Sequence, residues 1–320
     1  SGVPVYSSFL GGRQSDAAYA VAIDSAGAAY LTGQTCSGNF PTTPGALRAG
    51  YAGNCDAFAA KVTDDASAGL LVKILSAASF SGTTLAPESL ASAFGDKLAT
   101  STATAEPGAL PTSLAGTTVT VEDSSGVRRD AQLSYASPQQ VNFVVPAGLA
   151  SGPAKFTVTN GDGTVSRAQV RIAPFAPGLF SANANGQGVA AALLVTAPAD
   201  GAQLTSPIFR YDAARRQNVA VPLDLRAENA QYVLTLFGTG IRGRAALADV
   251  LVKIGGAECD VLYAGAQGEY PGLDQVNVRL PRSLLGRDEL SINLSVGGAS
   301  ANVVTVSIGG RPRIVSLSPD

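Results

Sequence analysis

The sequence contains no histidine, tryptophan or methionine among its 320 residues. Histidine is the usual general base at neutral pH and a common metal ligand, so its absence excludes a Ser-His-Asp triad. The three cysteines lack the C-x-x-C spacing of a zinc site, and no G-x-S-x-G, phosphate-binding or dinucleotide-binding motif is present. We therefore predict that the protein is not an enzyme and uses no cofactor or metal, while bound calcium stays an open question.

Charge is also scarce, because 14% of the residues are charged and the formal net charge is −2. Such a chain has no basic field to attract nucleic acid or an anionic membrane. The longest purely apolar run covers residues 189–195, which is far short of the ~18 residues of a membrane-spanning helix. Since the chain has no methionine, we expect that a leader or a longer N-terminal portion has been removed, and that the protein is extracellular or at the cell surface.

The sequence is rich in turn formers, with 36 glycines and 18 prolines between short runs of β-branched residues. Apolar and polar residues alternate along these runs, for example at 119–121, 141–145 and 156–159. Residues 160–163, Asn-Gly-Asp-Gly, have the composition of a hairpin turn. This pattern is typical of an all-β chain with strands that pack as sandwiches.

One motif occurs twice. Residues 135–146 and 263–281 both read Tyr-Ala, a turn-forming interval, Gln-Val-Asn, three mostly apolar residues and Pro. The second copy has seven extra residues in the interval. The repeat predicts two related β-modules in tandem, in which the Gln and Asn side chains (Gln140, Asn142, Gln275 and Asn277) face outward or hold the adjacent loop.

The first segment contains Leu-Gly-Gly at 10–12, Tyr-Leu-Thr-Gly at 30–33 and Phe-Pro-Thr-Thr-Pro-Gly-Ala at 40–46. With these landmarks, residues 4–62 resemble the SBBP-type bacterial β-propeller repeat, which implies one four-strand propeller blade. A propeller needs about 4 to 8 blades, and this chain supplies one. Because a single blade cannot bury both of its apolar faces, we expect it to pack on the domains that follow, on copies in other subunits, or on further blades of a longer product.

The remainder resembles the Solibacter-type C-terminal domain over about residues 71–310, on motifs at 74–80, 176–183, 185–192 and 271–277. Its strand order also resembles tandem immunoglobulin-like IPT/TIG modules. We therefore expect a blade-like repeat at 1–66, a first sandwich at 67–173, a second with inserted loops at 174–310, and an orphan strand or tail at 311–320. The resemblance implies an extracellular setting and no catalytic activity.

Cys36 and Cys55 lie in one Gly- and Asn-rich loop segment. We predict that they form a disulfide, which a processed extracellular protein would retain, although two free buried thiols are the alternative. Cys259 is left over. It fills a small apolar position in a strand or forms an intermolecular bridge.

Two segments are candidate contact sites. The inserted loop carries an acidic and aromatic cluster, and its candidate ligand or contact residues are Tyr263, Gln267, Glu269, Tyr270 and Asp274. The alternative for these residues is ordinary loop surface. The C-terminal strand is a candidate for pairing with another sheet edge through Arg313, Ile314, Val315, Ser316 and Leu317; its alternative is a tail that pairs within its own chain.

These features favour a secreted structural or adhesive protein that self-associates through its terminal repeat and its C-terminal strand, as a homo-oligomer or filament subunit. The alternative is a carbohydrate-binding module that uses the loop between Tyr263 and Asp274 on a surface polysaccharide. A third hypothesis, a glycoside hydrolase with Glu269 and Asp274 as acid and base, rests only on that carboxylate pair.

Overall fold

The computed structural model describes residues 9–24, 28–43, 46–48, 50–62, 70–106, 108–199 and 201–309. The chain divides into two units, Ser1–Ala68 and Gly69–Asp320. Strands dominate both units, and the only helical turns in the described ranges are η1 (Leu247–Asp249) and η2 (Arg282–Leu284), which confirms the predicted all-β fold class. Within these ranges, no helix is long and apolar enough to cross a membrane.

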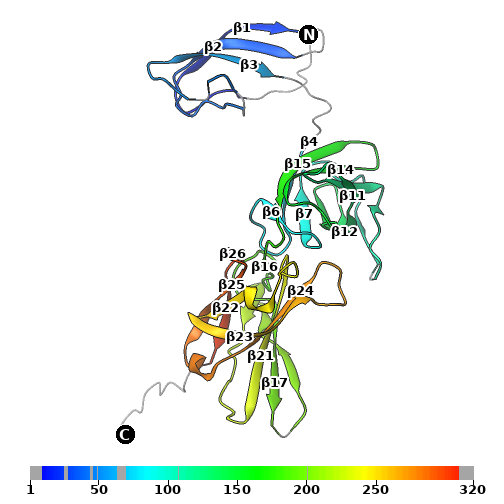
Figure 1. Ribbon diagram of the computed structural model, residues 1–320, viewed down its shortest axis with the longest axis vertical. Helices are drawn as coiled ribbons and strands as arrows, with labels where there is room; N and C mark the ends of the chain where they lie inside the picture. Colours follow the sequence, from blue (N-terminus) through cyan, green and yellow to red (C-terminus); the bar gives the residue numbers. More distant parts are fainter. Residues whose placement is uncertain are drawn as a thin grey trace. The chain divides into compact units, whose positions relative to one another are not determined.

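The first unit is a single antiparallel sheet of β1 (Asp16–Ile23), β2 (Ala29–Thr35) and β3 (Asp56–Val62), in that order (Figure 1). β1 contains a register shift between Ala18 and Ala20. Three strands of the expected four-strand meander are present in the described part of this unit; residues 9–12 form no strand, and residues 6–8 lie outside the described ranges.

The second unit begins with a sandwich of two sheets. One sheet runs in the order β11 (Arg128–Asp130), β10 (Thr117–Glu122), β14 (Gly152–Thr159), β15 (Val165–Ile172) and β4 (Leu70–Leu71), with β6 (Thr84–Leu85) and β9 (Ser113–Leu114) at its margins. The other runs in the order β5 (Lys73–Ser76), β7 (Leu90–Phe94), β13 (Gln140–Val144), β12 (Gln132–Ala136) and β8 (Ala103–Thr104). The alternating apolar side chains meet between the sheets, where the rings of Phe143 and Phe156 lie 6.0 Å apart.

The second module of this unit is built around a larger sheet, which runs in the order β18 (Leu204–Pro207), β17 (Ala192–Pro198), β21 (Ala230–Thr239), β24 (Asp274–Arg279), β23 (Ala257–Ala266), β22 (Val250–Ile254), β25 (Asp288–Val296) and β26 (Ala299–Ser300). β16 (Gly178–Leu179) pairs with β21, β27 (Val304–Ile308) pairs with β25, and β19 (Phe209–Asp212) with β20 (Gln217–Ala220) forms a separate hairpin. β23 pairs with β22 near its start and with β24 near its end. It thereby passes from one layer of the sandwich to the other.

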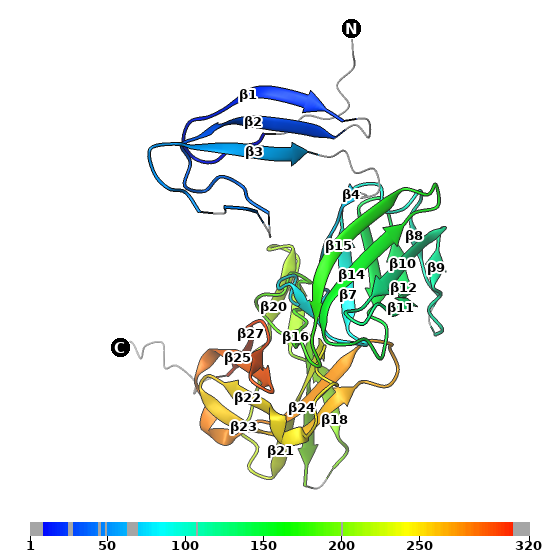
Figure 2. The same cartoon turned by 45° about the horizontal axis from the view of Figure 1, so that its top comes forward.

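Each module has its own hydrophobic core. The first core consists of buried residues between Val72 and Ile172, and the second of buried residues between Leu179 and Ile308. The two modules appear in Figure 2 as the group from β4 to β15 and the group from β16 to β27. Separate cores mean that contacts between the modules are made by surface residues and loops, and these contacts position the candidate site.

Candidate functional site

The repeated motif forms the same hairpin in both modules. Tyr135 of β12 pairs with Asn142 of β13, and Tyr263 of β23 pairs with Asn277 of β24. Each hairpin has a register shift directly before its tyrosine, as in a β-bulge. The two copies of the motif therefore share their backbone geometry as well as their residues.

The amides of the motif pair with each other along their own strands. Gln140 Nε2 donates to Asn142 Oδ1 at 2.8 Å, and Gln275 Nε2 donates to Asn277 Oδ1 at 2.9 Å. Residues two apart on a strand share a face, so each pair can satisfy part of its hydrogen bonding without reaching the loop. Of the two roles predicted for these amides, the position off the buried face is the one that their partly exposed side chains show, and the side-chain bonds seen in the described residues run along the strand.

Two of the predicted site residues build the inserted loop. The Gln267 side-chain oxygen accepts hydrogen bonds from the backbone N–H groups of Glu269 and Tyr270, and the Tyr263 hydroxyl donates to the carbonyl of Ala266. Glu269 and Tyr270 themselves project to solvent, and Tyr270 is 56% exposed. Tyr270 is thus the member of the set that is best placed to contact a partner.

Asp274 differs from the surface position expected for it, because its side chain is fully buried. Its Oδ2 accepts the backbone N–H of Ile241 at 2.7 Å, and its Oδ1 accepts Arg242 Nε at 2.6 Å. Burial raises the pKa of Asp274, and the hydrogen bonds from Ile241 and Arg242 act against this rise. A carboxylate enclosed in this way anchors the loop and is not open to a substrate, which removes the basis for a Glu269 and Asp274 catalytic pair.

Beside Asp274, Thr239 connects the two modules. Its buried hydroxyl accepts the backbone N–H of Leu90, in the first module, at 2.7 Å and donates to the carbonyl of Gly272 at 2.8 Å. Gly272 has a positive φ of 80°, and a Cβ there would lie 2.8 Å from Leu90 Cγ. The inserted loop therefore ends against the first module.

Arg242 extends this junction. Its Nη2 donates to the carbonyl of Leu273 at 2.7 Å, and its Nη1 lies 3.7 Å from Glu88 of the first module. The sequence analysis did not identify Arg242, Thr239 or Glu88 as site residues. One difference between the two motif copies could have indicated them: the second copy has Asp274 where the first has Gln139. An acidic residue that is buried needs a cationic partner, which here is Arg242.

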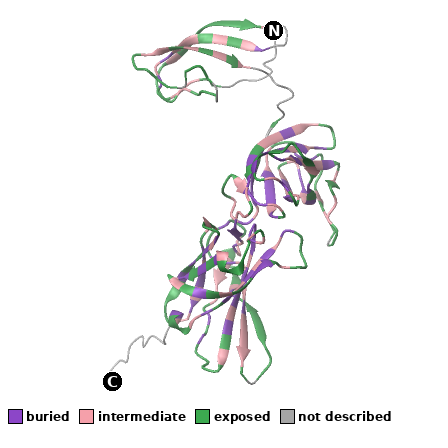
Figure 3. Ribbon diagram, viewed as in Figure 1, coloured by how far each residue is buried: buried purple, intermediate pink, exposed green. Residues whose placement is uncertain are grey.

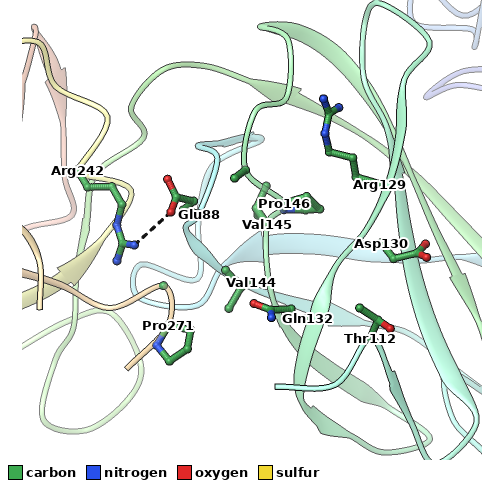
Figure 4. A pocket seen from close by; sticks show the side chains of 12 residues that line it. Glu88, Thr112, Arg129, Asp130, Gln132, Val144, Val145, Pro146, Arg242 and Pro271 are labelled. Carbon is green, nitrogen blue, oxygen red and sulfur yellow. Dashed lines mark ion pairs between the residues drawn. The ribbon is translucent and has the colours of Figure 1, made fainter. Parts of the chain in front are cut away.

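A groove of about 440 Å³ lies along the junction and takes residues from both modules. Figure 4 shows Arg242 facing Glu88 on one side of it, and Asp130, Gln132 and Thr112 on the other. Val144, Pro146 and Pro271 add apolar surface, and the remaining lining residues are Arg129, Val145, Ala147 and Gly272. The groove is thus a mixed surface with several hydrogen-bonding groups.

Both guanidinium groups of the groove are already paired with buried carboxylates. Arg242 binds Asp274, and Arg129 Nη1 lies 3.2 Å from Asp123 Oδ2, whose side chain is 2% exposed. Hydrogen bonds from the backbone of Ala150 and from Ser125 lower the pKa of Asp123, so it stays ionised at neutral pH. The groove consequently offers fixed polar groups but no unpaired cation for a polyanion.

The sheet of the first unit presents a different kind of surface. Cross-strand neighbours share a face, and the pairing places Val21, Ile23, Ala29, Leu31, Phe58, Ala60 and Val62 on one face, which we call the large face. Val21 and Ile23 are 64% and 72% exposed. Figure 3 shows β1 to β3 mostly as exposed and intermediate, whereas buried strands occur throughout the two modules.

The cysteines behave as the sequence indicates. Cys36 and Cys55 form a disulfide within the first unit, which confirms the prediction. Cys259 is a free, buried thiol of the second core, and burial raises its pKa to about 11. It pairs with Val252 on β22 where β23 passes between the layers, so it fills a small apolar position there.

The segment from Arg313 to Leu317, the candidate self-association strand, lies outside the described residues. Over the ranges that are described, no group of three or more Cys, Asp or Glu side chains is arranged to hold a metal ion.

No protein-family model matches the chain, and no curated protein matches it. Among solved structures, it is similar to a Bacteroides ovatus mixed-linkage glucan utilization locus protein, SGBP-B, in complex with a mixed-linkage heptasaccharide, with 12% identity over 89% of this chain and a TM-score of 0.34. It is also similar to domains 4–9 of the surface layer protein SbsC, with 12% identity over 89% of this chain and a TM-score of 0.21. The matches cover 53% and 35% of those two chains. At these values the likeness carries no functional argument.

Proposed function

We propose that the protein is an extracellular, non-enzymatic structural protein that self-associates through the sheet β1–β2–β3. The observation that carries this proposal is the exposure of Val21 and Ile23 on an apolar sheet face. Monomeric soluble proteins rarely expose contiguous apolar surface, and such patches mark interaction sites. The occupant we propose is a second copy of the same sheet.

The first unit has little core of its own. The hydrophobic clusters of buried residues lie in the second unit, at 72–172 and 179–308 of the described chain. One three-stranded sheet buries little apolar surface without a partner layer. A further layer on the large face would remove Val21 and Ile23 from water, at a gain of about 25 cal/mol per Å² of apolar surface.

The setting we propose follows from the disulfide and from the sequence. The Cys36–Cys55 bond is stable in an oxidising compartment and would be reduced in most cytosols. The resemblance of residues 4–62 to a propeller repeat gives the same expectation of a neighbouring blade-like sheet. Pairing of the segment from Arg313 to Leu317 with another chain stays a prediction.

The test is the mass of the full chain in solution as a function of concentration, by light scattering after size exclusion. We expect the wild-type chain to associate and the variant Ile23→Asp to weaken association by about tenfold or more, since it places a charge in an apolar contact. Leu251→Asp is the matched control, because Leu251 is an exposed apolar strand residue of the second unit. A wild-type chain that is monomeric at every concentration would refute the proposal.

A second candidate function is the binding of a neutral polysaccharide in the junction groove. Its carboxylate, amide and hydroxyl groups, on Glu88, Asp130, Gln132 and Thr112, can hydrogen-bond sugar hydroxyls, and its apolar residues can contact a sugar ring. Binding of an acidic polysaccharide is disfavoured, because the guanidinium groups of Arg242 and Arg129 are already paired with carboxylates. Tyr270, one residue before Pro271 of the groove, is the exposed aromatic of the same loop.

Calorimetric titration with neutral oligosaccharides of glucose, galactose and mannose tests this second function. We expect Gln132→Ala to reduce affinity for the bound sugar about tenfold, as the loss of a buried hydrogen bond does. Glu269→Ala, in the exposed part of the loop, is the control. Loss of affinity in Tyr270→Ala without any change in Gln132→Ala would move the site from the groove to the loop, and silence with every sugar would eliminate this function.

A further inference from the structure

The two copies of the repeated hairpin differ in what lies beside them. In the first module, β8 pairs with β12 on the side away from β13, with Thr104 opposite Tyr135. The backbone N–H of Ala105 continues this pairing by donating to the carbonyl of Ser134. β12 is therefore an interior strand of its sheet, and β8 closes the edge.

In the second module, the corresponding side of β23 is open. β23 pairs with β24 from Asp260 to Ala266, but with β22 only from Ala257 to Cys259. Beyond Cys259, no strand of the described ranges lies on the side of β23 away from β24. The intervening chain is shorter here, since residues 95–116 of the first module contain β8 and β9, whereas residues 240–249 of the second contain only the turn η1.

The side chains along this open edge are more exposed than their counterparts in the first module. Leu262 and Tyr263 are 42% and 40% exposed. Ser134 and Tyr135, at the same places in the motif, are half-buried. An unpaired strand edge with apolar side chains beside it is a template for another extended chain.

The opposite edge of the same sheet is a poorer template. Its edge strand, β18, has four residues and ends with Pro207. Proline has no backbone N–H to donate, and short edge strands and proline both hinder the addition of a further strand. The open edge of β23 is therefore the better acceptor in this sheet.

β27, the last described strand, ends far from the open edge. β25 and β22 separate β27 from β23 in the sheet, a distance of about 14 Å. Ile308 at the end of β27 lies opposite Asp288. Ile292 is four residues after Asp288 on β25, and it is level with Ala257 across β22. Asp260 is three residues after Ala257, so it lies about seven residues, or about 23 Å, further along the strands than Asp288.

The C-terminal segment of the same chain is too short to follow this edge. Arg313 is four residues after Gly309, and four residues span at most about 14 Å. Arg313 therefore stops well short of Asp260, where the open edge begins. The segment contains the β-branched residues Ile314 and Val315, which favour strands, so a second copy is the source that can supply it along the whole edge.

We propose that the segment Arg313–Leu317 of one copy adds as a strand to the Asp260–Ala266 edge of β23 in another copy, at the place that β8 takes in the first module. The inference extends the proposed self-association and does not depend on the contact made by the sheet β1–β2–β3. Donor and acceptor lie on different parts of the chain, so each copy can donate to one neighbour and accept from another.

Cysteine crosslinking between full chains tests this pairing. Leu262→Cys marks the acceptor edge and Ser316→Cys the donor segment. Leu204→Cys is the matched control, because Leu204 is an exposed leucine of the opposite edge strand β18. The native cysteines are bonded or buried, and the wild-type chain measures their background reaction. Mixed chains are treated with a short bis-maleimide, and the products are separated on a denaturing gel.

We expect crosslinked dimers when the Leu262→Cys and Ser316→Cys chains are mixed, and only background product when Leu204→Cys replaces Leu262→Cys. Addition of Ile314→Pro and Val315→Pro to the donor should reduce the product about tenfold, because one of two adjacent prolines removes an N–H that faces the edge. Equal product with Leu204→Cys, or no effect of the prolines, would overturn the inference. A chain with both Leu262→Cys and Ser316→Cys that crosslinks within itself at low concentration would also overturn it.

A further variant separates this inference from the proposed function. The crosslinked product should persist when Ile23→Asp is added to both chains, and its loss there would overturn the inference, since the contact would then depend on the first unit. Absence of product in chains that associate by light scattering would overturn the inference and leave the proposed function standing. A wild-type chain that is monomeric at every concentration would refute both.

Discussion

Replacement of Arg242 by alanine is expected to lower the free energy of unfolding of the second unit by about 3–5 kcal/mol. The substitution leaves the carboxylate of Asp274 buried without its cation, and burial of an unpaired charge is costly. It also removes the donor to the carbonyl of Leu273 and the ion pair with Glu88. Chemical denaturation followed by circular dichroism measures the change.

Arg279→Ala is the control for this prediction. Arg279 pairs with Asp260, and the two side chains are 49% and 73% exposed, so loss of the pair should cost about 0–1 kcal/mol. The double variant Arg242→Met with Asp274→Leu should recover much of the loss, since it removes both charges together. A loss in Arg242→Ala no larger than in Arg279→Ala would show that Asp274 is not held by this contact.

Removal of the disulfide is expected to destabilise the first unit by about 3 kcal/mol in the chain-entropy model. The bond closes a loop with a sequence separation of 19 residues, in a unit with little core of its own. Cys36→Ser combined with Cys55→Ser should therefore lower or abolish the melting transition of this unit and, with it, self-association. The transition of the second unit should stay in place.

Differential scanning calorimetry of the full chain reads both transitions in one experiment. Cys259→Ala is the matched control, because Cys259 belongs to the second core and should affect only the second transition. If the double serine variant melted like the wild type in both transitions, the first unit would not depend on its disulfide.

The sequence predicted the all-β class, because period-2 alternation and turn residues are local signals. The repeated hairpin is the clearest case. In the structure, the Gln of each copy pairs with a phenylalanine of the preceding strand: Phe94 of β7 with Gln140, and Phe237 of β21 with Gln275. Cys259 likewise fills a small buried strand position, which was one of its two expected roles.

The junction between the modules was not predictable in the same way. Arg242 lies in the turn after β21 and Asp274 begins β24, so only the folded chain brings them together. A Gly- and Pro-rich loop is expected to be exposed, but the last residues of this loop are buried against Leu90. The sequence left two roles open for the amides of the motif; in the structure Gln275 bonds Asn277 along one strand, and Gln267 holds the loop backbone.

Hydroxyl-radical footprinting of the wild-type chain across a concentration series tests self-association through β1–β2–β3 most directly, since it reads the exposure of individual side chains. We expect oxidation of Ile23 and Leu31 on the large face to fall as the protein concentration rises. Leu251 and Tyr270, which are exposed on the second unit, should react equally at all concentrations. Unchanged oxidation of Ile23 and Leu31 over the whole series, or protection confined to the second unit, would contradict it.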